Sequence, residues 1–368
     1  MSFFSYIFIG EKMKKIVLLI LFLIIPLNVN AYSSSATSTI LMDTDNNRIL
    51  YASNIHEVRS IASISKIMTA ILAIENSDLE QEVVIGDEIN EAYGSGIYIK
   101  KGEVLTVKDL VYGLMLRSGN DAALAIAHHV GGSVDDFVKL MNEKAKELGM
   151  KNTTFNNPSG LDEDKGNYST AYDMAILTSY AMKNETYKEI TKTKKYKLKT
   201  NLNYYEWINK NKLLSSYKYA TGGKTGFTKI AKRTLVTTAS KDNINLVAVT
   251  LNDGNDFEDH KNLFEETFNA YQNYSILKKG NINITDEKYY KKHILYIKND
   301  FNYLLSNNEK NNIILKFELE KKYDYKDGDK IGNVIVKLGD TRIHKEDIYI
   351  KLNKTKISIW ELIARWFK

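Results

Sequence analysis

The chain has 368 residues, enough for one large domain and a smaller companion, and its 43% hydrophobic and 26% charged residues are ordinary for a folded protein. The formal net charge of +6 comes from 51 basic and 45 acidic residues spread along the whole chain, which argues against nucleic-acid binding. There are no cysteines, which excludes a thiol nucleophile, disulfides and cysteine-ligated metals. The histidines show no metal-binding spacing, so we expect neither a metal nor a cofactor.

The N-terminus, residues 1–31, is predicted to be a secretory signal. Lys14 and Lys15 precede an apolar run over residues 16–27, and the run ends at Val29-Asn30-Ala31. These are the basic, apolar and small-residue parts of a signal peptide, so we predict cleavage after Ala31. The residues before Met13 resemble an extension, and Met13 is an alternative start. An uncleaved anchor is disfavoured because the run is shorter than the roughly 20 residues that span a bilayer. The mature protein is expected to act outside the cytoplasm.

Residues 32–274 are predicted to form a mixed domain of sheet and helices. Residues 39–43 and 48–51 resemble two strands around the turn-forming Asp45-Asn46-Asn47. Apolar residues follow Ser63 at helical spacing, so Ser63 is expected near a helix start. Further helices are predicted over 105–116, 122–130, 134–148 and 257–271, and further strands over 234–238 and 245–251. Strands at both ends that enclose helices indicate this mixed architecture.

The remaining chain divides into two parts. Residues 275–352 show short alternating runs and turn signals such as Asp327-Gly328-Asp329, which predict a small β-rich domain. Residues 353–368 are predicted to form an amphipathic helix with two tryptophans and a phenylalanine on one face and basic residues on the other. This composition is typical of a helix that lies in a membrane interface. The alternative is a terminal helix that packs on its own domain.

Three short motifs carry the predicted chemistry: Ser63-Ile64-Ser65-Lys66, Ser118-Gly119-Asn120 and Lys224-Thr225-Gly226. Each alone has an ordinary structural explanation, namely a capped helix, a turn and a surface loop. In this order, however, motifs of these types are the known signature of class A β-lactamases and penicillin-binding proteins. The first is expected to open a helix, the second to lie between helices and the third to precede a strand-rich region. Together they indicate an enzyme that is acylated on serine.

Ser63 is the predicted nucleophile and Lys66 its base. Residues i and i+3 share one face of a helix, so the Lys66 amine can lie beside the Ser63 hydroxyl. Lys66 accepts a proton only if its pKa is lowered by burial and a neighbouring cation, for which Lys224 is the candidate. One backbone N–H at the helix start and a second from the strand after Gly226 are expected to bind the oxyanion.

The other motif residues are predicted to handle the substrate. Ser118 is placed to relay a proton between the two lysines and the leaving amine, and Asn120 to hold the substrate amide. Lys224 and Thr225 supply a cation and a hydroxyl for a carboxylate, while Gly226 lets a substrate backbone lie against the strand edge. Such a site suits peptides that end in a free carboxylate.

The motifs and their surroundings resemble the serine-type D-alanyl-D-alanine carboxypeptidases, which are low-molecular-mass penicillin-binding proteins. The likeness covers about residues 36–270 and includes the segments 66–70, 113–122, 157–161, 169–175 and 223–228, so Phe227 joins the predicted substrate-binding residues. It implies an α/β (α+β) transpeptidase/β-lactamase-like domain with an antiparallel sheet flanked by helices, followed by a β-rich domain. It also implies a C-terminal amphipathic anchor on the outer face of the cytoplasmic membrane.

The resemblance further implies the substrate and the inhibitors. Ser63 would attack the bond between the two D-alanines of a peptidoglycan stem peptide, D-alanine would leave, and water would release the acyl-enzyme. β-Lactams would acylate the same serine. Three positions depart from the family: Ile61 replaces the usual proline, Ser65 a common threonine, and Lys232 the glycine before Arg233. Lys232 leaves the loop geometry and the substrate preference open.

Two other functions stay open at this point. A class A β-lactamase needs a glutamate that activates the deacylating water, and Glu163 is a candidate. A penicillin-binding sensor or wall-binding module would keep the pocket without turnover. Sensors generally need a membrane-spanning segment, and the sequence shows none after residue 31. The β-rich region and the amphipathic end favour the carboxypeptidase.

Overall fold

The computed structural model describes residues 34–162, 165–284, 290, 293–321 and 324–352. The predicted signal segment, Glu163 and the predicted C-terminal helix lie outside these residues. Within the described residues, no helix combines the length and the apolar character that crossing a bilayer requires.

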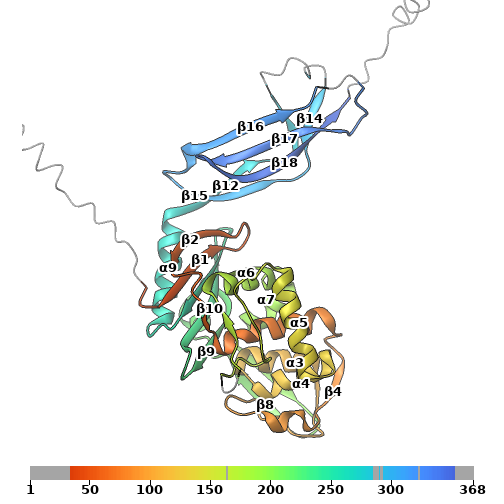
Figure 1. Cartoon of the computed structure of the whole chain (residues 1–368), viewed down its shortest axis with the longest axis vertical. Coiled ribbons are helices and arrows are strands. Elements are labelled where there is room, and N and C mark those ends of the chain that lie inside the picture. The colour runs from red at the N-terminus through yellow and green to blue at the C-terminus, as the bar shows by residue number, and fades with distance from the viewer. Residues whose placement is uncertain (1–33, 163–164, 285–289, 291–292, 322–323, 353–368) are drawn as a thin grey trace, which may run out of the picture. The chain divides into compact units, whose positions relative to one another are not determined.

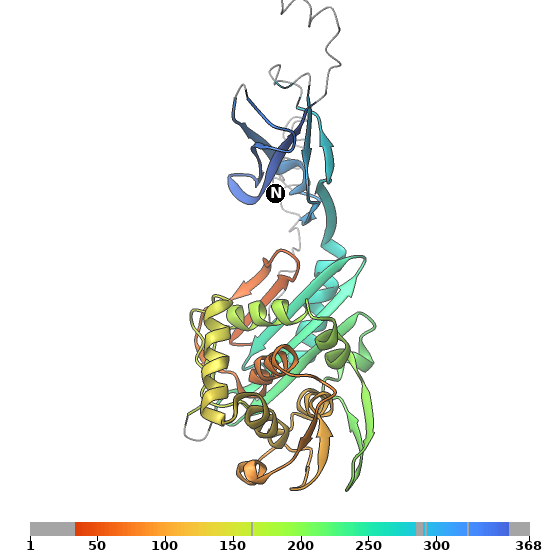
Figure 2. The same ribbon diagram turned by 90° about the vertical axis from the view of Figure 1, so that its right-hand side faces the viewer.

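The N-terminal domain is built on a five-stranded antiparallel sheet in the order β2-β1-β11-β10-β9. Its strands are β1 (Ser38–Asp43), β2 (Arg48–Ser53), β9 (Ala220–Thr228), β10 (Lys232–Lys241) and β11 (Ile244–Leu251). Strands from the start and the end of this domain therefore lie side by side, as Figures 1 and 2 show. β9 lies at the edge of this sheet, so one side of its backbone faces no other described strand of the sheet.

Helices cover both faces of this sheet. Thr237 of β10 contacts His260 of α9 (Asp256–Ala270), whereas the next residue, Thr238, contacts Met182 at the end of α6 (Ala171–Ala181). Successive side chains of a strand point to opposite faces, so α9 and α6 lie on opposite sides of the sheet (Figure 1). The fold class expected from the sequence, an antiparallel sheet flanked by helices, is confirmed.

The other helices and short strands of this domain complete the scaffold around the first motif. The helices are α2 (Lys66–Asn76), α3 (Val107–Tyr112), α4 (Asn120–Gly131), α5 (Val134–Glu147), α7 (Glu185–Lys192) and α8 (Leu213–Ser216). Three two-stranded sheets pair β3 (Arg59–Ser60) with β6 (Tyr168–Ser169), β4 (Glu82–Val84) with β5 (Val104–Thr106), and β7 (Lys195–Lys199) with β8 (Tyr204–Ile208).

Two local predictions are wrong. The helix predicted over 105–116 starts two residues later in the structure, because Thr106 and Asp109 form a capping box at the start of α3. Its last part is a π-helical turn, Gly113–Arg117. The third motif does not precede the strands but lies inside β9. Its glycines masked the strand signal, since glycine has low strand propensity.

The C-terminal domain is β-rich, as predicted. Its five-stranded sheet has the order β13-β14-β18-β17-β16, and β12 pairs with β15 in a separate ribbon. The strands are β12 (Tyr271–Leu277), β13 (Gly280–Ile282), β14 (Ile294–Ile297), β15 (Phe301–Ser306), β16 (Ile313–Leu319), β17 (Lys330–Leu338) and β18 (Thr341–Lys351). Alternate residues of β17 and β18, including Val334, Val336, Ile348 and Ile350, are buried in its own hydrophobic core.

Candidate active site

Ser63 lies in a tight 3-10 turn, Ala62–Ser65, that leads directly into α2. The preceding residue, Ala62, has a φ of 49°, a left-handed conformation that is unfavourable for alanine. Gly160 packs on this turn so closely that a Cβ atom there would lie 2.0 Å from the Ala62 carbonyl oxygen. The strained turn therefore depends on a glycine from a distant loop.

Lys66 is the first residue of α2 and is completely buried. Its Nζ lies 3.2 Å from Ser63 Oγ and donates hydrogen bonds to Asn120 Oδ1 at 2.6 Å and to the Ser159 carbonyl oxygen at 2.5 Å. A neutral amine has two N–H donors and one lone pair. Asn120 and Ser159 can take both donors, which leaves the lone pair for the Ser63 hydroxyl.

The pKa of Lys66 is lowered to about 7, chiefly because burial disfavours the charged form and secondarily because Lys210 is a nearby cation. A large part of the population is thus neutral near physiological pH. The sequence predicted that Lys224 is the cation that lowers this pKa. Lys66 and Lys224 do repel each other, but the repulsion lowers the pKa of Lys224, whereas the cation that lowers the pKa of Lys66 is Lys210, which belongs to none of the three motifs.

Ser118 and Asn120 flank the start of α4. Ser118 ends the π-helical turn with a φ of 65°, and its Oγ accepts a hydrogen bond of 2.9 Å from Lys224 Nζ. The Asn120 side chain links two elements, because its Oδ1 accepts from Lys66 and its Nδ2 donates to the Tyr93 carbonyl oxygen at 2.6 Å. One N–H of its amide group is therefore occupied by Tyr93 in this structure, and the second N–H can donate to a substrate carbonyl.

Lys224 is also buried, with 1% of its surface exposed. Its Nζ donates to Ser118 Oγ and, at 2.7 Å, to the Thr225 carbonyl oxygen. Burial first, and then the charges of Lys66 and Lys210, hold its pKa well below the usual value for lysine. Lys224 is consequently suited to exchanging a proton with Ser118, and is a weaker cation for a carboxylate than the sequence suggested.

The edge strand β9 brings Gly226 against the nucleophile. A Cβ atom at Gly226 would lie 3.0 Å from the Ser63 backbone nitrogen and 2.4 Å from Thr234 Oγ1. Phe227, the next residue, has 65% of its surface exposed. The upstream end of β9 is covered, since Thr191 of α7 exchanges hydrogen bonds with the backbone of Gly223. The open edge near residues 225–228 is where an extended peptide can add to the sheet.

A cavity of about 380 Å³ opens beside Ser63. Residues from all around the site line it: Gly94, Ser95, Gly96, Tyr98, Arg117, Asn120, Leu161, Lys210, Phe227 and Thr228. Asp121 holds the loop that contains Gly96 and Tyr98, because its carboxylate accepts backbone N–H bonds from Ile97 at 3.0 Å and Tyr98 at 2.6 Å.

The sequence missed several of these contributors. Arg117 and Asp121 adjoin the second motif, and Ser159 lies in segment 157–161, so their neighbourhoods were noticed without a role for the residues themselves. Lys210 follows β8 and belongs to no motif, and Ser159 acts through its backbone carbonyl. Nothing in the sequence alone distinguishes such residues.

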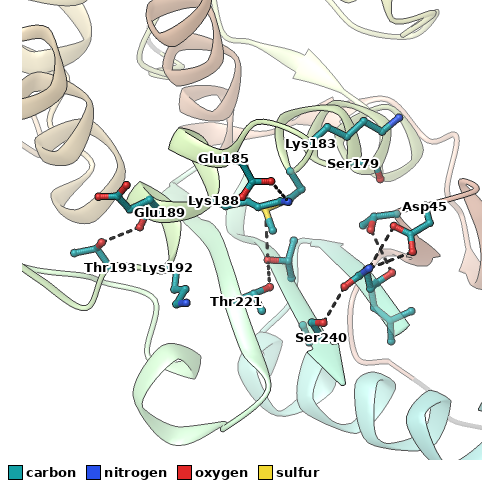
Figure 3. A pocket seen from close by; sticks show the side chains of 16 residues that line it. Asp45, Ser179, Lys183, Glu185, Lys188, Glu189, Lys192, Thr193, Thr221 and Ser240 are labelled. Atoms are coloured by element: carbon teal, nitrogen blue, oxygen red, sulfur yellow. Dashed lines mark hydrogen bonds and ion pairs between the residues drawn. The ribbon is translucent and has the colours of Figure 1, made fainter. Parts of the chain in front are cut away.

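A larger cavity, of about 900 Å³, lies elsewhere in the same domain, and none of the three motifs lines it. Figure 3 shows its side chains, which come from α6, α7, the ends of β9, β10 and β11 and the turn that follows β1, where Asp45 lies. Lys188 pairs with Glu185 at 2.7 Å, and the Ser240 hydroxyl donates to Asn245 at 2.8 Å. None of the described serines there forms a serine–lysine pair like that of Ser63.

Comparison with known proteins agrees with this geometry. The family model described as D-alanyl-D-alanine carboxypeptidase matches residues 26–255, and the model of the penicillin-binding protein 5 C-terminal domain matches residues 271–356. The D-alanyl-D-alanine carboxypeptidase DacF of Bacillus subtilis is 40% identical over 58% of this chain and 56% of its own. A D-alanyl-D-alanine carboxypeptidase of Mycobacterium tuberculosis is 34% identical over 58% of this chain and 73% of its own.

Solved structures are similar over more of the chain. Penicillin binding protein 5 from Haemophilus influenzae has a TM-score of 0.74 and 26% identity, and the match covers 87% of this chain and 98% of the other. The D-alanyl-D-alanine carboxypeptidase DacD from Francisella tularensis has a TM-score of 0.68 and 26% identity, over 90% of this chain and 95% of the other. The chain spans little more than half the length of the B. subtilis relative.

Proposed function

The chain belongs to the D-alanyl-D-alanine carboxypeptidase family, and from this we propose that it removes the terminal D-alanine from peptidoglycan stem peptides through an acyl-enzyme on Ser63, which penicillins also acylate. One observation carries the proposal. The fully buried Lys66 amine, with a pKa of about 7, lies 3.2 Å from the Ser63 hydroxyl. A serine hydroxyl is a weak nucleophile until such a base takes its proton.

In the proposed acylation step, Ser63 Oγ attacks the carbonyl carbon of the penultimate D-alanine, and the proton of the Ser63 hydroxyl passes to Lys66 Nζ. The carbonyl becomes an oxyanion near the Ser63 backbone N–H, beside which β9 runs at Gly226. General-base assistance accounts for roughly 10²–10⁴-fold of the rate, so oxyanion binding and positioning supply the remainder.

The C–N bond then breaks, and D-alanine leaves after its nitrogen receives a proton. Ser118, which accepts a hydrogen bond from Lys224, is placed to deliver that proton, and the proton that Lys66 took from Ser63 is proposed to pass through Lys224 to Ser118, so that both lysines are neutral and Ser118 is again a hydroxyl when D-alanine has left. Asn120, Thr225, Gly226 and Phe227 are proposed to align the peptide along the open edge of β9. A water molecule that gives its proton to Lys66 would hydrolyse the ester and restore Ser63.

We also propose that the protein is exported and held on the outer face of the cytoplasmic membrane. The basic and apolar N-terminal segment supports export, and the amphipathic pattern of residues 353–368 supports attachment to the outer face of the cytoplasmic membrane. We place a peptidase domain at 32–274 and a β-rich domain at 275–352. Removal of residues 360–368 should release the exported protein from membranes without loss of peptidase activity. Retention on the membrane would reject the anchor.

The decisive experiment uses the chain from residue 32 to 356 with a diacetyl-L-lysyl-D-alanyl-D-alanine peptide, and measures free D-alanine. Steady release that is lost in Ser63→Ala is the expected result. Stable labelling by a fluorescent penicillin without D-alanine release would instead indicate a penicillin-binding sensor. Rapid turnover of a chromogenic cephalosporin without D-alanine release would indicate a β-lactamase.

A further inference from the structure

The cavity of about 900 Å³ in Figure 3 has more than twice the volume of the cavity of about 380 Å³ beside Ser63. Its volume is in the range of cavities that bind small molecules, but such cavities are usually lined by apolar and aromatic side chains. Among the described residues that line it there is no aromatic side chain, and only Met182, Ala239 and Leu246 are apolar. The lining therefore favours a polar ligand with many hydrogen-bonding groups.

Two lysines at the rim of this cavity have no counter-ion. Lys183 follows α6 by two residues and Lys192 ends α7, and both are exposed. Neither forms an ion pair with a carboxylate of the described residues, whereas Lys188 is paired with Glu185 at 2.7 Å. The two unpaired ammonium groups are suited to an anionic ligand.

The other two carboxylates of the lining have neutral partners. Glu189 accepts a hydrogen bond from the Tyr112 hydroxyl at 3.2 Å, and Asp45 accepts one from the Asn245 amide at 3.1 Å. A carboxylate has about four lone-pair sites, so Asp45 can accept further hydrogen bonds from hydroxyl groups of a ligand. The cavity thus offers cations for an anion and acceptors for hydroxyl donors.

Two buried hydroxyl groups of the lining donate only to thioether sulfur. Ser179 Oγ of α6 lies 4.0 Å from Met42 Sδ, and Thr238 Oγ1 of β10 lies 3.9 Å from Met182 Sδ. Each of these two residues has 2% of its surface exposed, so they belong to the floor of the cavity. Sulfur is a weak acceptor, and a buried donor without a good partner is unfavourable. An oxygen atom of a ligand would be a stronger acceptor for both.

We propose that this cavity binds a phosphate ester of a polyol, such as a glycerol phosphate unit. A phosphoryl group accepts hydrogen bonds in several directions, and the donors come from three elements: Lys192 from α7, Ser179 from α6 and Thr238 from β10. Asp45 and Ser240, on the other side of Thr221 from Lys192 in Figure 3, serve the polyol hydroxyls. The unit can belong to a wall polymer or to a lipid headgroup. The site is separate from the proposed peptidase site, since none of the three motifs lines it.

Fluorescence polarisation with a labelled synthetic trimer of glycerol phosphate tests the proposal. Saturable binding is expected, and Lys183→Gln and Lys192→Gln should each weaken it by roughly tenfold, as for the loss of a charge-assisted hydrogen bond. Lys194→Gln is the matched control, because Lys194 is exposed and does not line the cavity. The absence of saturable binding, or equal weakening by Lys194→Gln, would overturn the site.

Ser179→Ala tests the floor of the cavity. The variant loses a hydroxyl whose sulfur partner is weak, so its free energy of unfolding in urea should stay the same. Its affinity for the trimer should fall by about threefold or more, because one hydrogen bond to the anion is lost. Unimpaired binding in Ser179→Ala would remove the floor from the site and reject the assignment.

Lys210→Gln excludes binding in the other cavity, because Lys210 lines the cavity beside Ser63. This variant should bind the trimer as the unmodified protein does. Weakening by Lys210→Gln but not by Lys192→Gln would place the anion beside Ser63 and overturn the proposal. The assay involves no peptide turnover, so its result is independent of the proposed carboxypeptidase activity.

Vesicles distinguish the two sources of the phosphate ester. Binding to phosphatidylcholine vesicles with and without phosphatidylglycerol is compared between the unmodified protein and Lys192→Gln, so that attachment through other residues cancels. Phosphatidylglycerol-dependent binding that falls in Lys192→Gln would identify a lipid headgroup. Trimer binding without such an effect on vesicles would identify a wall polymer. Lys192-independent binding of both probes would refute the site.

Discussion

The backbone nitrogen of Ser63 and the α-carbon of Gly226 are so close that a single added methyl group at Gly226 would come within 3.0 Å of that nitrogen. Gly226→Ala is therefore expected to obstruct the site where the oxyanion forms. The acylation rate should fall by roughly 10²-fold or more, as when one oxyanion donor is lost. The rate constant for labelling by a fluorescent penicillin measures this.

Gly254→Ala is a suitable control for that substitution, because nothing lies within 4 Å of a Cβ atom there and its φ is not in the left-handed region. It should acylate at the normal rate. Gly226→Ala with unimpaired labelling would show that the close approach of β9 to Ser63 is not required.

The pH dependence of acylation should report the protonation of Lys66. Only the neutral amine can accept the Ser63 proton, and the pKa is about 7. The rate should thus fall about tenfold per pH unit well below pH 7 and level off above it. Lys210→Gln removes a charge that lowers this pKa, so its acidic limb should move to higher pH. A shift to lower pH would contradict the assigned role of Lys210.

His260 should make the protein sensitive to acid. It is fully buried between Thr237 and Thr250, and burial lowers its pKa from 6.5 to about 3. Between these values the unfolded chain binds a proton that the folded chain excludes, so stability is present above pH 6.5 and is lost as the pH falls. The loss amounts to about 3 kcal/mol between pH 7 and pH 4.

Urea unfolding of the unmodified protein and of His260→Gln at both pH values checks this contribution. Glutamine retains hydrogen-bonding capacity but does not titrate. The variant should lose less of its free energy of unfolding between pH 7 and pH 4 than the unmodified protein. The same loss in both would show that other groups account for the acid sensitivity.

Lys232 should be a strained position. It begins β10 with a φ of 60°, a conformation that suits glycine, which is the residue usual there in the resembling family. Lys232→Gly should relieve this strain in the folded state. The relief should exceed the cost of the larger conformational entropy that glycine gives the unfolded chain, so the free energy of unfolding should rise by about 1 kcal/mol. Lys229→Gly, in the adjoining turn and without a positive φ, should destabilise instead. Destabilisation by both would refute the strain.

Ile61 illustrates a departure that the structure accommodates. Its φ is −110° and its backbone N–H donates to the Asn167 carbonyl oxygen at 3.2 Å. Proline could do neither, because its ring fixes φ near −65° and removes the donor. The loop that carries Asn167 is thus tied to the start of the nucleophile turn by a bond that the usual residue cannot make.

The sequence by itself determined the architecture and the chemical residue types. Periodicity placed most strands and helices because apolar residues recur at 2 or about 3.6 positions, and the motif order placed Ser63, Lys66, Ser118 and Lys224 in one family of sites. Local spacing was sufficient for the Ser63–Lys66 pair, since the two residues are three apart.

Only the tertiary structure decided which groups surround that pair. Lys210 comes from one loop and the adjacent Ser159 and Gly160 from another. They act through charge, a backbone carbonyl and the lack of a side chain, none of which leaves a periodic pattern in the sequence. The lowered pKa of Lys66 likewise depends on complete burial, a property of the packed domain. Spacing could therefore predict the nucleophile and its base, whereas the environment that makes the base effective required the fold.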